Sequence, residues 1–249
     1  MRELRDSHLL PKAAVRRTLC KEGNPHPFVV TPSAMTLAST QAKHYLLCRE
    51  CENRFSDGGE KWILANCLQA DQSSFPLREK LLATDPIFRD AVRDFRVYST
   101  VDKQDISHEK IIYFAASVFW RCSVHDWPLR GHQIRTDLGP YQEPLRRFLL
   151  GEIPFPTAMV LIVRISTMAK NLEVVTYPQL RRIETFRQHM FSMLGMYFWL
   201  LVGKVIAGTY RAICYASKPE RPIVMCGDLD NMQLSSLIEI VQRGPGPRT

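Results

Sequence analysis

Apolar side chains recur at helical spacing through the first two thirds of the chain. These intervals align the side chains on one face of a 3.6-residue repeat, which predicts amphipathic or buried helices. Ser107 precedes the longest apolar segment and is expected to be its N-cap. Gly58 and Gly59 are candidate interruptions of the first helix. We expect helices over residues 49–69, 77–84, 107–125 and 143–150.

The pattern changes after Pro154 and Pro156, where β-branched residues form continuous apolar runs. Such runs predict buried strands over residues 158–165, 172–177 and 205–215. The most apolar stretch covers residues 191–202 and is followed by Lys204. This stretch is shorter than the roughly 20 residues that cross a bilayer, so it predicts a buried strand or hairpin and no membrane partner.

Glycine and proline mark the breaks between these segments. They predict an open loop over residues 18–40 and a disordered tail over residues 243–249. A boundary near residue 153 separates a helical middle from a strand-rich end, although both parts can share one core. The expected divisions are residues 1–70, 71–153, 154–242 and 243–249.

Composition and charge limit the classes of function. Among 249 residues, 45% are hydrophobic and 23% are charged, which suits a folded domain with a substantial core. The formal net charge of +8 is compatible with a phosphate-rich partner. The excess is densest in residues 130–187, where arginines form either a phosphate-facing patch or an ordinary solvated face. These arginines are Arg146, Arg147, Arg181, Arg182 and Arg187.

Cysteine usage and the N-terminus predict the compartment. Seven cysteines without a regular spacing indicate a reducing environment rather than a disulfide framework. Met1 is followed by a charged segment and not by the apolar run of a secretory signal. We therefore expect a cytoplasmic protein.

Two short motifs carry candidate chemistry: Ser7-His8-Leu9-Leu10-Pro11 and Leu47-Cys48-Arg49-Glu50-Cys51-Glu52. Phosphodiester hydrolysis needs a base that takes a proton from water, and histidine suits this task because its pKa lies near neutrality. His8 is the candidate base. Cys48 and Cys51 have the spacing of half a tetrahedral zinc site.

Together these motifs resemble the HNH, or ββα-metal, endonuclease module. They are similar to an uncharacterised bacterial group with Ser/Ala-His-Ile-Ile-Pro-Lys followed by Leu-Leu-Cys-x-x-Cys-Glu-x-Arg-Phe-Ser and then a glutamate. The likeness covers Ser7 to Lys12 and Leu46 to Ser56, and extends more loosely over residues 113–121. It implies an N-terminal ββα-metal module. With the helical middle and the strand-rich C-terminal part that the apolar pattern predicts, the expected fold class is α+β.

The resemblance also implies roles for individual residues. His8 would be the general base of a DNA endonuclease, with Glu52 and Asp6 holding Mg²⁺ or Mn²⁺. Cys48 and Cys51 would hold a structural Zn²⁺. Many such modules act in bacterial defence against phage, and a partner protein could control the activity. The expected DNA contacts are Lys12, Arg16, Arg17 and Arg54.

Several positions depart from the family pattern. Ser7 stands where a metal-binding aspartate is common, and Glu52 stands where the last metal-binding histidine is common. Only seven residues precede His8 here, and they hold no second Cys-x-x-Cys, so either such a pair lies upstream of this sequence or zinc has been lost. Cys20 and Cys67 are the candidates within this sequence to complete a four-thiolate site. The usual central asparagine is missing, and His44 and Gln41 are the nearby polar candidates to replace it.

Each motif also has an ordinary structural interpretation. His8 can be a solvated side chain, the cysteine pair can serve packing or redox chemistry, and Glu52 suits the first turn of a helix because of the macrodipole. A metal-dependent DNA endonuclease is the leading hypothesis. The alternatives are a nucleic-acid-binding or scaffold protein that keeps the fold without turnover, and a membrane-associated toxin built on residues 191–202.

Overall fold

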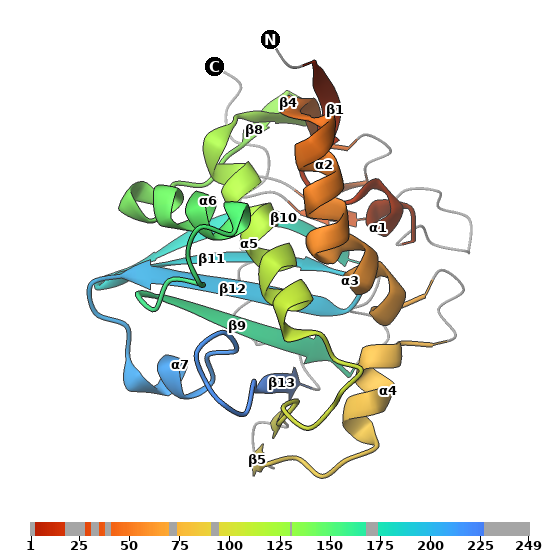
Figure 1. Ribbon diagram of the computed structural model, residues 1–249, viewed down its shortest axis with the longest axis vertical. Helices are drawn as coiled ribbons and strands as arrows, with labels where there is room; N and C mark the ends of the chain where they lie inside the picture. The colour runs from red at the N-terminus through yellow and green to blue at the C-terminus, as the bar shows by residue number, and fades with distance from the viewer. Residues whose placement is uncertain are drawn as a thin grey trace.

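The computed structural model combines a large mixed β-sheet with helices that cover one of its faces (Figure 1). This confirms the mixed α+β class and the strand-rich C-terminal part. The residues that the structure describes are 3–17, 28–30, 35–37, 41–69, 74–90, 95–129, 131–167 and 174–226. The expected tail over residues 243–249 lies outside these ranges.

Within the ranges that the structure describes, the central sheet has nine strands, in the order β3-β2-β10-β11-β12-β9-β13-β6-β5. The four longest lie side by side in the order β10, β11, β12 and β9, with each adjacent pair antiparallel, and they form the middle of the sheet. The strands are β2 (Phe28–Val30), β3 (Met35–Leu37), β5 (Phe88–Asp90), β6 (Phe95–Tyr98), β9 (Met159–Ser166), β10 (Val174–Ile183), β11 (Phe186–Met193), β12 (Met196–Gly203) and β13 (Ile223–Cys226). The sheet thus takes strands from the N-terminal, middle and C-terminal parts of the chain.

The stretch over residues 191–202 forms the adjoining halves of β11 and β12, as the sequence predicts. A two-residue turn joins them, and both turn residues have positive φ, 53° at Leu194 and 76° at Gly195. Two positive φ values match the twist of a tight hairpin. Leu194 is fully buried, so packing holds its unfavourable backbone conformation in place.

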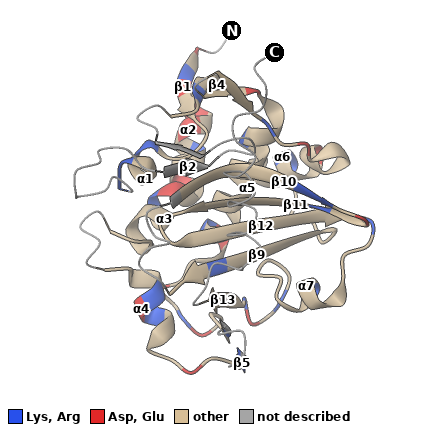
Figure 2. Ribbon diagram, turned by 180° about the vertical axis from the view of Figure 1, so that it is seen from behind, with Lys and Arg blue, Asp and Glu red and all other residues tan. Residues whose placement is uncertain are grey.

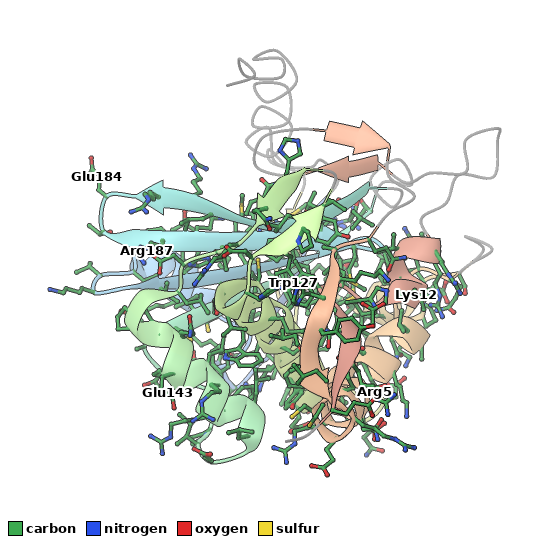
Figure 3. All side chains as sticks on the ribbon, turned by 90° about the horizontal axis from the view of Figure 1, so that it is seen from above. Arg5, Lys12, Trp127, Glu143, Glu184 and Arg187 are labelled. Carbon is green, nitrogen blue, oxygen red and sulfur yellow. The ribbon has the colours of Figure 1, made fainter. Side chains whose placement is uncertain are left out.

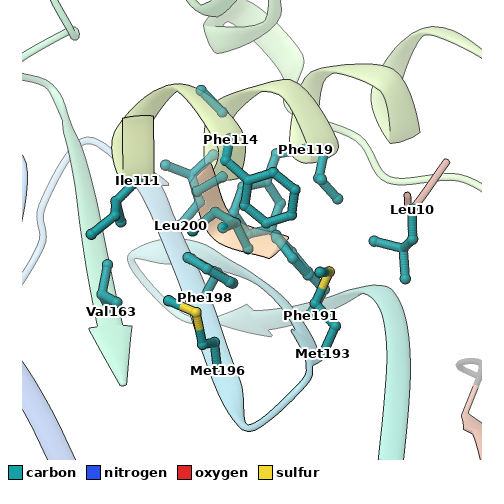
Figure 4. Packing of buried hydrophobic residues seen from close by; sticks show 14 of the residues in the cluster. Leu10, Ile111, Phe114, Phe119, Val163, Phe191, Met193, Met196, Phe198 and Leu200 are labelled. Atoms are coloured by element: carbon teal, nitrogen blue, oxygen red, sulfur yellow. The ribbon is translucent and has the colours of Figure 1, made fainter. Parts of the chain in front are cut away.

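Helix α5 (His108–Val124) packs across the centre of this sheet. Figure 4 shows Phe114 and Phe119 of α5 pointing toward Phe191 and Phe198 of the strands. The rings of Phe119 and Phe191 meet edge to face at 5.0 Å, and those of Phe191 and Phe198 stack at 4.8 Å. Burial of these rings is the main stabilising contribution of this layer.

A smaller strand pair and a helical segment lie beside α5. Strand β1 (Leu4–His8) pairs antiparallel with β4 (Lys43–Cys48), and α2 (Arg49–Phe55) follows β4 without a loop. A π-helical turn, Ser56–Glu60, and α3 (Lys61–Asn66) continue the same helical path. The expected helix over residues 49–69 is therefore present, with a widened turn at Gly58 and Gly59.

Gly59 lets the π-helical turn approach α5 closely. A Cβ atom at this position would lie 2.5 Å from the carbonyl oxygen of Lys110 and 2.7 Å from Cβ of Phe114. Only glycine permits so close an approach to α5.

The remaining elements are α1 (Lys12–Arg17), α4 (Pro76–Leu82), β7 (Trp127–Leu129), β8 (His132–Ile134), the 3₁₀ turn Gly139–Tyr141, α6 (Gln142–Leu150) and α7 (Gly208–Ala212).

Three expectations about local structure are wrong. Residues 205–215 do not form a strand but lead into the short helix α7, which packs with Ile206 and Cys214 against the second face of the sheet. The expected loop over residues 18–40 contains β2 and β3. The helical middle also contains the strands β5 to β8. In each case pairing or packing with distant residues overrides the local pattern.

Candidate functional site

The candidate site lies where β1 ends and α2 begins. In the β1–β4 pair, Ser7 is opposite His44 and His8 is opposite Lys43. Because α2 starts directly after β4, its first turn lies next to these positions and carries Glu52. The two sequence motifs, about forty residues apart, thus meet in one place.

Ser7 connects the motifs directly. Its side chain is 1% exposed, and its hydroxyl donates a hydrogen bond to Oε1 of Glu52. The hydroxyl oxygen of Ser7 also accepts a hydrogen bond of 3.1 Å from the backbone N–H of Leu47. Ser7 therefore orients the Glu52 carboxylate toward the strand that carries His8. The sequence identified position 7 only as a departure from the family pattern.

His8 is half-buried, and its environment favours the neutral ring. Burial is the largest influence and holds the pKa of His8 below its ordinary value. The nearby charges partly cancel: Asp6 and Glu52 raise this pKa, whereas Lys12 and Lys43 lower it. A neutral imidazole near pH 7 can accept a proton, as a general base must.

Asp6 is exposed and already has a partner. Nζ of Lys43 lies 2.7 Å from Oδ2 of Asp6, and this hydrogen bond lowers the pKa of the carboxyl. Asp6 therefore acts on His8 as a nearby negative charge. To bind a cation, it would have to exchange the lysine for the metal.

A buried arginine holds the backbone of His8. Arg121 of α5 is 2% exposed, and its Nη1 donates a hydrogen bond of 2.8 Å to the carbonyl oxygen of His8. Its Nη2 lies 2.7 Å from Oε1 of Glu60, and its Nε donates to the carbonyl of Ser117. The guanidinium also lies 5.4 Å from the ring centroid of Phe55. This network joins β1, the π-helical turn and α5.

Sequence reasoning did not identify Arg121 or Glu60 as members of the site. The available signal is the position of Arg121 in the apolar helical run over residues 107–125, where an isolated charge requires a buried partner. That partner cannot be chosen from sequence, because the pairing is between residues 61 positions apart.

The zinc prediction gains no further ligands from the described residues. Cys48 ends β4, Cys51 lies in the first turn of α2, and both are half-buried. Cys67 is buried, which raises the pKa of its thiol to about 12, and Nη1 of Arg17 lies 3.9 Å from its Sγ. Cys20 lies outside the described ranges. Within those ranges, no three His, Cys, Asp or Glu side chains are grouped to hold a metal ion.

A magnesium or manganese ion requires fewer protein ligands than a structural zinc ion. Such a cation keeps several waters and takes further oxygen ligands from substrate phosphates, so one or two protein carboxylates can suffice. Glu52 is a hard oxygen donor fixed by Ser7, and Asp6 is a second on the neighbouring strand. The donor chemistry therefore fits a hard cation better than it fits zinc.

Of the four predicted DNA contacts, two are exposed on α1 and two donate hydrogen bonds to backbone carbonyls within the protein. Lys12 and Arg16 are exposed on α1, which begins four residues after His8. Figure 3 shows Lys12 on this helix, beside β1. Arg17 instead donates to the carbonyl of Leu64, next to Cys67. Arg54 donates to the carbonyl of Leu150 at 3.2 Å and lines an apolar pocket of about 580 Å³ between α2, α5 and α6.

The two candidates to replace the central asparagine lie in different settings. His44 is exposed on β4, and its ring lies 4.0 Å from that of His125. Burial, followed by the charge of His44, lowers the pKa of His125. The side-chain oxygen of Gln41 is buried without a hydrogen-bond partner in the part of the chain that the structure describes. Neither residue contacts His8 in the way that Ser7 contacts Glu52.

Comparison with models of known protein families, with curated proteins and with solved structures gave no match for this chain. Function must therefore be argued from the chemistry of the site. Among the described helices, none combines the length and the apolar character required to span a bilayer.

Proposed function

We propose that the protein is a metal-dependent endonuclease of HNH type that hydrolyses phosphodiester bonds of DNA. The hydrogen bond from Ser7 to Glu52 is the observation that carries this proposal. It fixes a carboxylate from the start of a helix beside the strand that ends in a half-buried histidine. The chain order of β1, β4 and α2 is compatible with a ββα-metal module in which α1, β2 and β3 are inserted between the two strands.

In this mechanism, neutral His8 takes the proton from the attacking water. Arg121 fixes the backbone carbonyl of His8 and thereby limits the movement of the ring. Glu52, with Asp6 after its release from Lys43, would hold a Mg²⁺ or Mn²⁺ ion. When bound, such a cation stabilises negative charge on the phosphate and on the departing oxygen. Lys12 and Arg16 would contact neighbouring phosphates.

Cleavage of plasmid DNA tests this proposal. The full chain should convert supercoiled plasmid to nicked or linear forms with Mg²⁺ or Mn²⁺, and a chelator should stop the reaction. His8→Ala should reduce the rate by at least the 10² that general-base catalysis commonly contributes. Cutting by His8→Ala at the wild-type rate, with both proteins equally pure and folded, would remove His8 from the mechanism.

A second candidate is a nucleic-acid-binding or scaffold protein without turnover. The ion pair between Asp6 and Lys43 favours it, because this contact occupies one of the two proposed cation ligands. The two candidates differ in one outcome. The scaffold protein would bind DNA under the same conditions but leave it uncut at every concentration of Mg²⁺ and Mn²⁺.

The remaining parts of the proposal rest on the resemblance. A defence role and a controlling partner protein are implied by the activities of similar modules. Structural zinc at Cys48 and Cys51 requires two further ligands, with Cys20 the remaining cysteine candidate outside the described ranges. Metal analysis of the purified protein, with Cys48→Ser as the comparison, decides whether zinc is bound there.

A further inference from the structure

The turn between β10 and β11 forms the base of a basic pocket far from His8. The pocket has a volume of about 470 Å³, and we call it the hairpin pocket. Its walls come from the ends of β10, β11 and β12 and from the 3₁₀ turn before α6. The residues that define it here are Tyr141, Arg182, Glu184, Arg187, Gly203 and Lys204.

Strand pairing concentrates positive charge in this pocket. Arg182 and Arg187 are directly opposite each other in the β10–β11 ladder. Like charges at opposite positions repel each other, so an anion that binds between them would relieve an unfavourable contact. In Figure 2, this end of the sheet carries blue segments on β10 and β11. Arg181, next in sequence, is also exposed.

Lys204 is the third cation of the pocket, and it directly follows Gly203 at the end of β12. Gly203 is paired with Phe186 across the β11–β12 ladder. A Cβ atom at position 203 would lie 2.7 Å from Cα and Cβ of Phe186, so the close packing here requires glycine. Lys204 follows directly and is exposed at the rim.

The neighbouring carboxylates compensate only part of this charge. Nη1 of Arg187 lies 2.9 Å from Oδ2 of Asp137, which holds that guanidinium over the backbone of Gly139. Glu184 is exposed at the turn. Neither Arg182 nor Lys204 forms an ion pair with any residue in the described ranges. Two uncompensated cations beside a positioned arginine suit a ligand that carries several phosphate charges.

We propose that the hairpin pocket binds phosphate groups of a nucleic acid and gives the protein a DNA contact separate from the cleavage site. This inference extends the proposed nuclease function and rests on it for the choice of DNA. Figure 1 places the β10–β11 turn and the β1–α1 region at opposite sides of the molecule.

The salt dependence of DNA binding tests this inference. Binding of a fluorescently labelled 20-base-pair duplex to the full chain would be measured by anisotropy at several salt concentrations, without divalent cations. Each lost phosphate contact reduces the slope of log K against log salt by about 0.9. The double variant Arg182→Gln/Lys204→Gln should therefore have a slope that is shallower by about 1.8. Its affinity should fall by the same factor for duplexes of unrelated sequence.

Two other variants control for general charge effects. Arg146→Gln removes an exposed arginine that both carboxylate oxygens of Glu143 already hold, and it should leave the slope nearly unchanged. Glu184→Gln removes a negative charge from the pocket and should tighten binding. Circular dichroism would establish that all variants keep the wild-type fold. A double variant that is folded and retains the wild-type slope would overturn the proposal.

The same measurements separate this inference from the nuclease proposal. If the protein cuts DNA and the double variant keeps the wild-type slope, the nuclease stands and the hairpin pocket does not bind DNA. If no DNA is cut but the slope falls, the pocket stands without the nuclease. Pyrophosphate and ATP would be titrated by calorimetry as free phosphate ligands. If wild type binds these ligands but no DNA, and the double variant loses that binding, the pocket belongs to a free nucleotide and the DNA proposal is overturned. If wild type binds neither these ligands nor DNA, the proposal is also overturned.

Discussion

The geometry of the candidate site depends on single residues to which the recognised pattern of its two motifs assigns no chemical role. His8, Glu52 and the cysteine pair could be chosen from the sequence because their spacing matches a known chemical pattern. Ser7, Arg121 and Glu60 could not, since their roles depend on contacts between distant elements. The sequence thus supplied the candidates for the reacting groups, whereas the residues that contact them appeared only in the structure.

Breaking the Arg121–Glu60 pair should destabilise the protein strongly. Glu60→Ala leaves the guanidinium of Arg121 buried without its carboxylate, which commonly costs about 3–5 kcal/mol. Glu60→Gln/Arg121→Met removes both charges and should recover much of that stability, as measured by urea unfolding. DNA cleavage should stay low in the double variant, because the carbonyl of His8 loses its donor. A double variant as active as wild type would contradict the positioning role of Arg121.

Elements formed by a clear local pattern were predicted well, and those formed by distant pairing were not. Helix α5, helix α6 and strand β9 follow their apolar patterns closely. Residues 205–215 have the composition of a strand, yet they form the short helix α7 and pack Ile206 and Cys214 against the second face of the sheet. Strands β2 and β3 exist because β10 provides an edge for parallel pairing.

The π-helical turn makes a prediction at the scale of elements. Gly59→Ala places a Cβ against the backbone of α5 at Lys110, and the π-helical turn and α5 must separate to accept it. We expect a loss of about 3 kcal/mol in the free energy of unfolding, because backbone atoms cannot move aside as a flexible side chain can. Gly208→Ala is the matched control: no atom lies within 4 Å of its added methyl, and helix propensity favours alanine. Equal effects of the two substitutions would show that the close packing at Gly59 is unimportant.

At the scale of the whole molecule, one sheet and one main core integrate segments from all parts of the chain. The core also encloses a histidine. His189 of β11 is fully buried, contacts the hydroxyl of Thr136 through Nδ1, and has no partner for Nε2 in the described part of the chain. Burial lowers the pKa of His189 to about 4.

This buried ring should make stability depend on pH. In the unfolded chain His189 gains a proton below about pH 6.5, whereas in the folded protein it stays neutral down to about pH 4. The unfolded state therefore binds more protons in this window, and stability falls as the pH falls, by about 3 kcal/mol in total from this residue. Urea unfolding at pH 7 and pH 5 should show the loss, and His189→Gln should show a smaller one. An equal loss in both proteins would assign the pH dependence to other groups.

The role of Glu52 is the central claim, and its metal dependence is the most direct test. Rates of plasmid cleavage would be measured against Mg²⁺ and Mn²⁺ concentration for wild type, Glu52→Gln and Glu50→Gln. Glu50 lies in the same first turn of α2 and is exposed, so its variant controls for the loss of one negative charge. We predict that Glu50→Gln cuts like wild type, whereas folded Glu52→Gln requires far more metal and cuts at least tenfold more slowly. Full Mg²⁺-dependent activity in Glu52→Gln would show that the cation is held elsewhere and that the proposed site is not the cleavage centre.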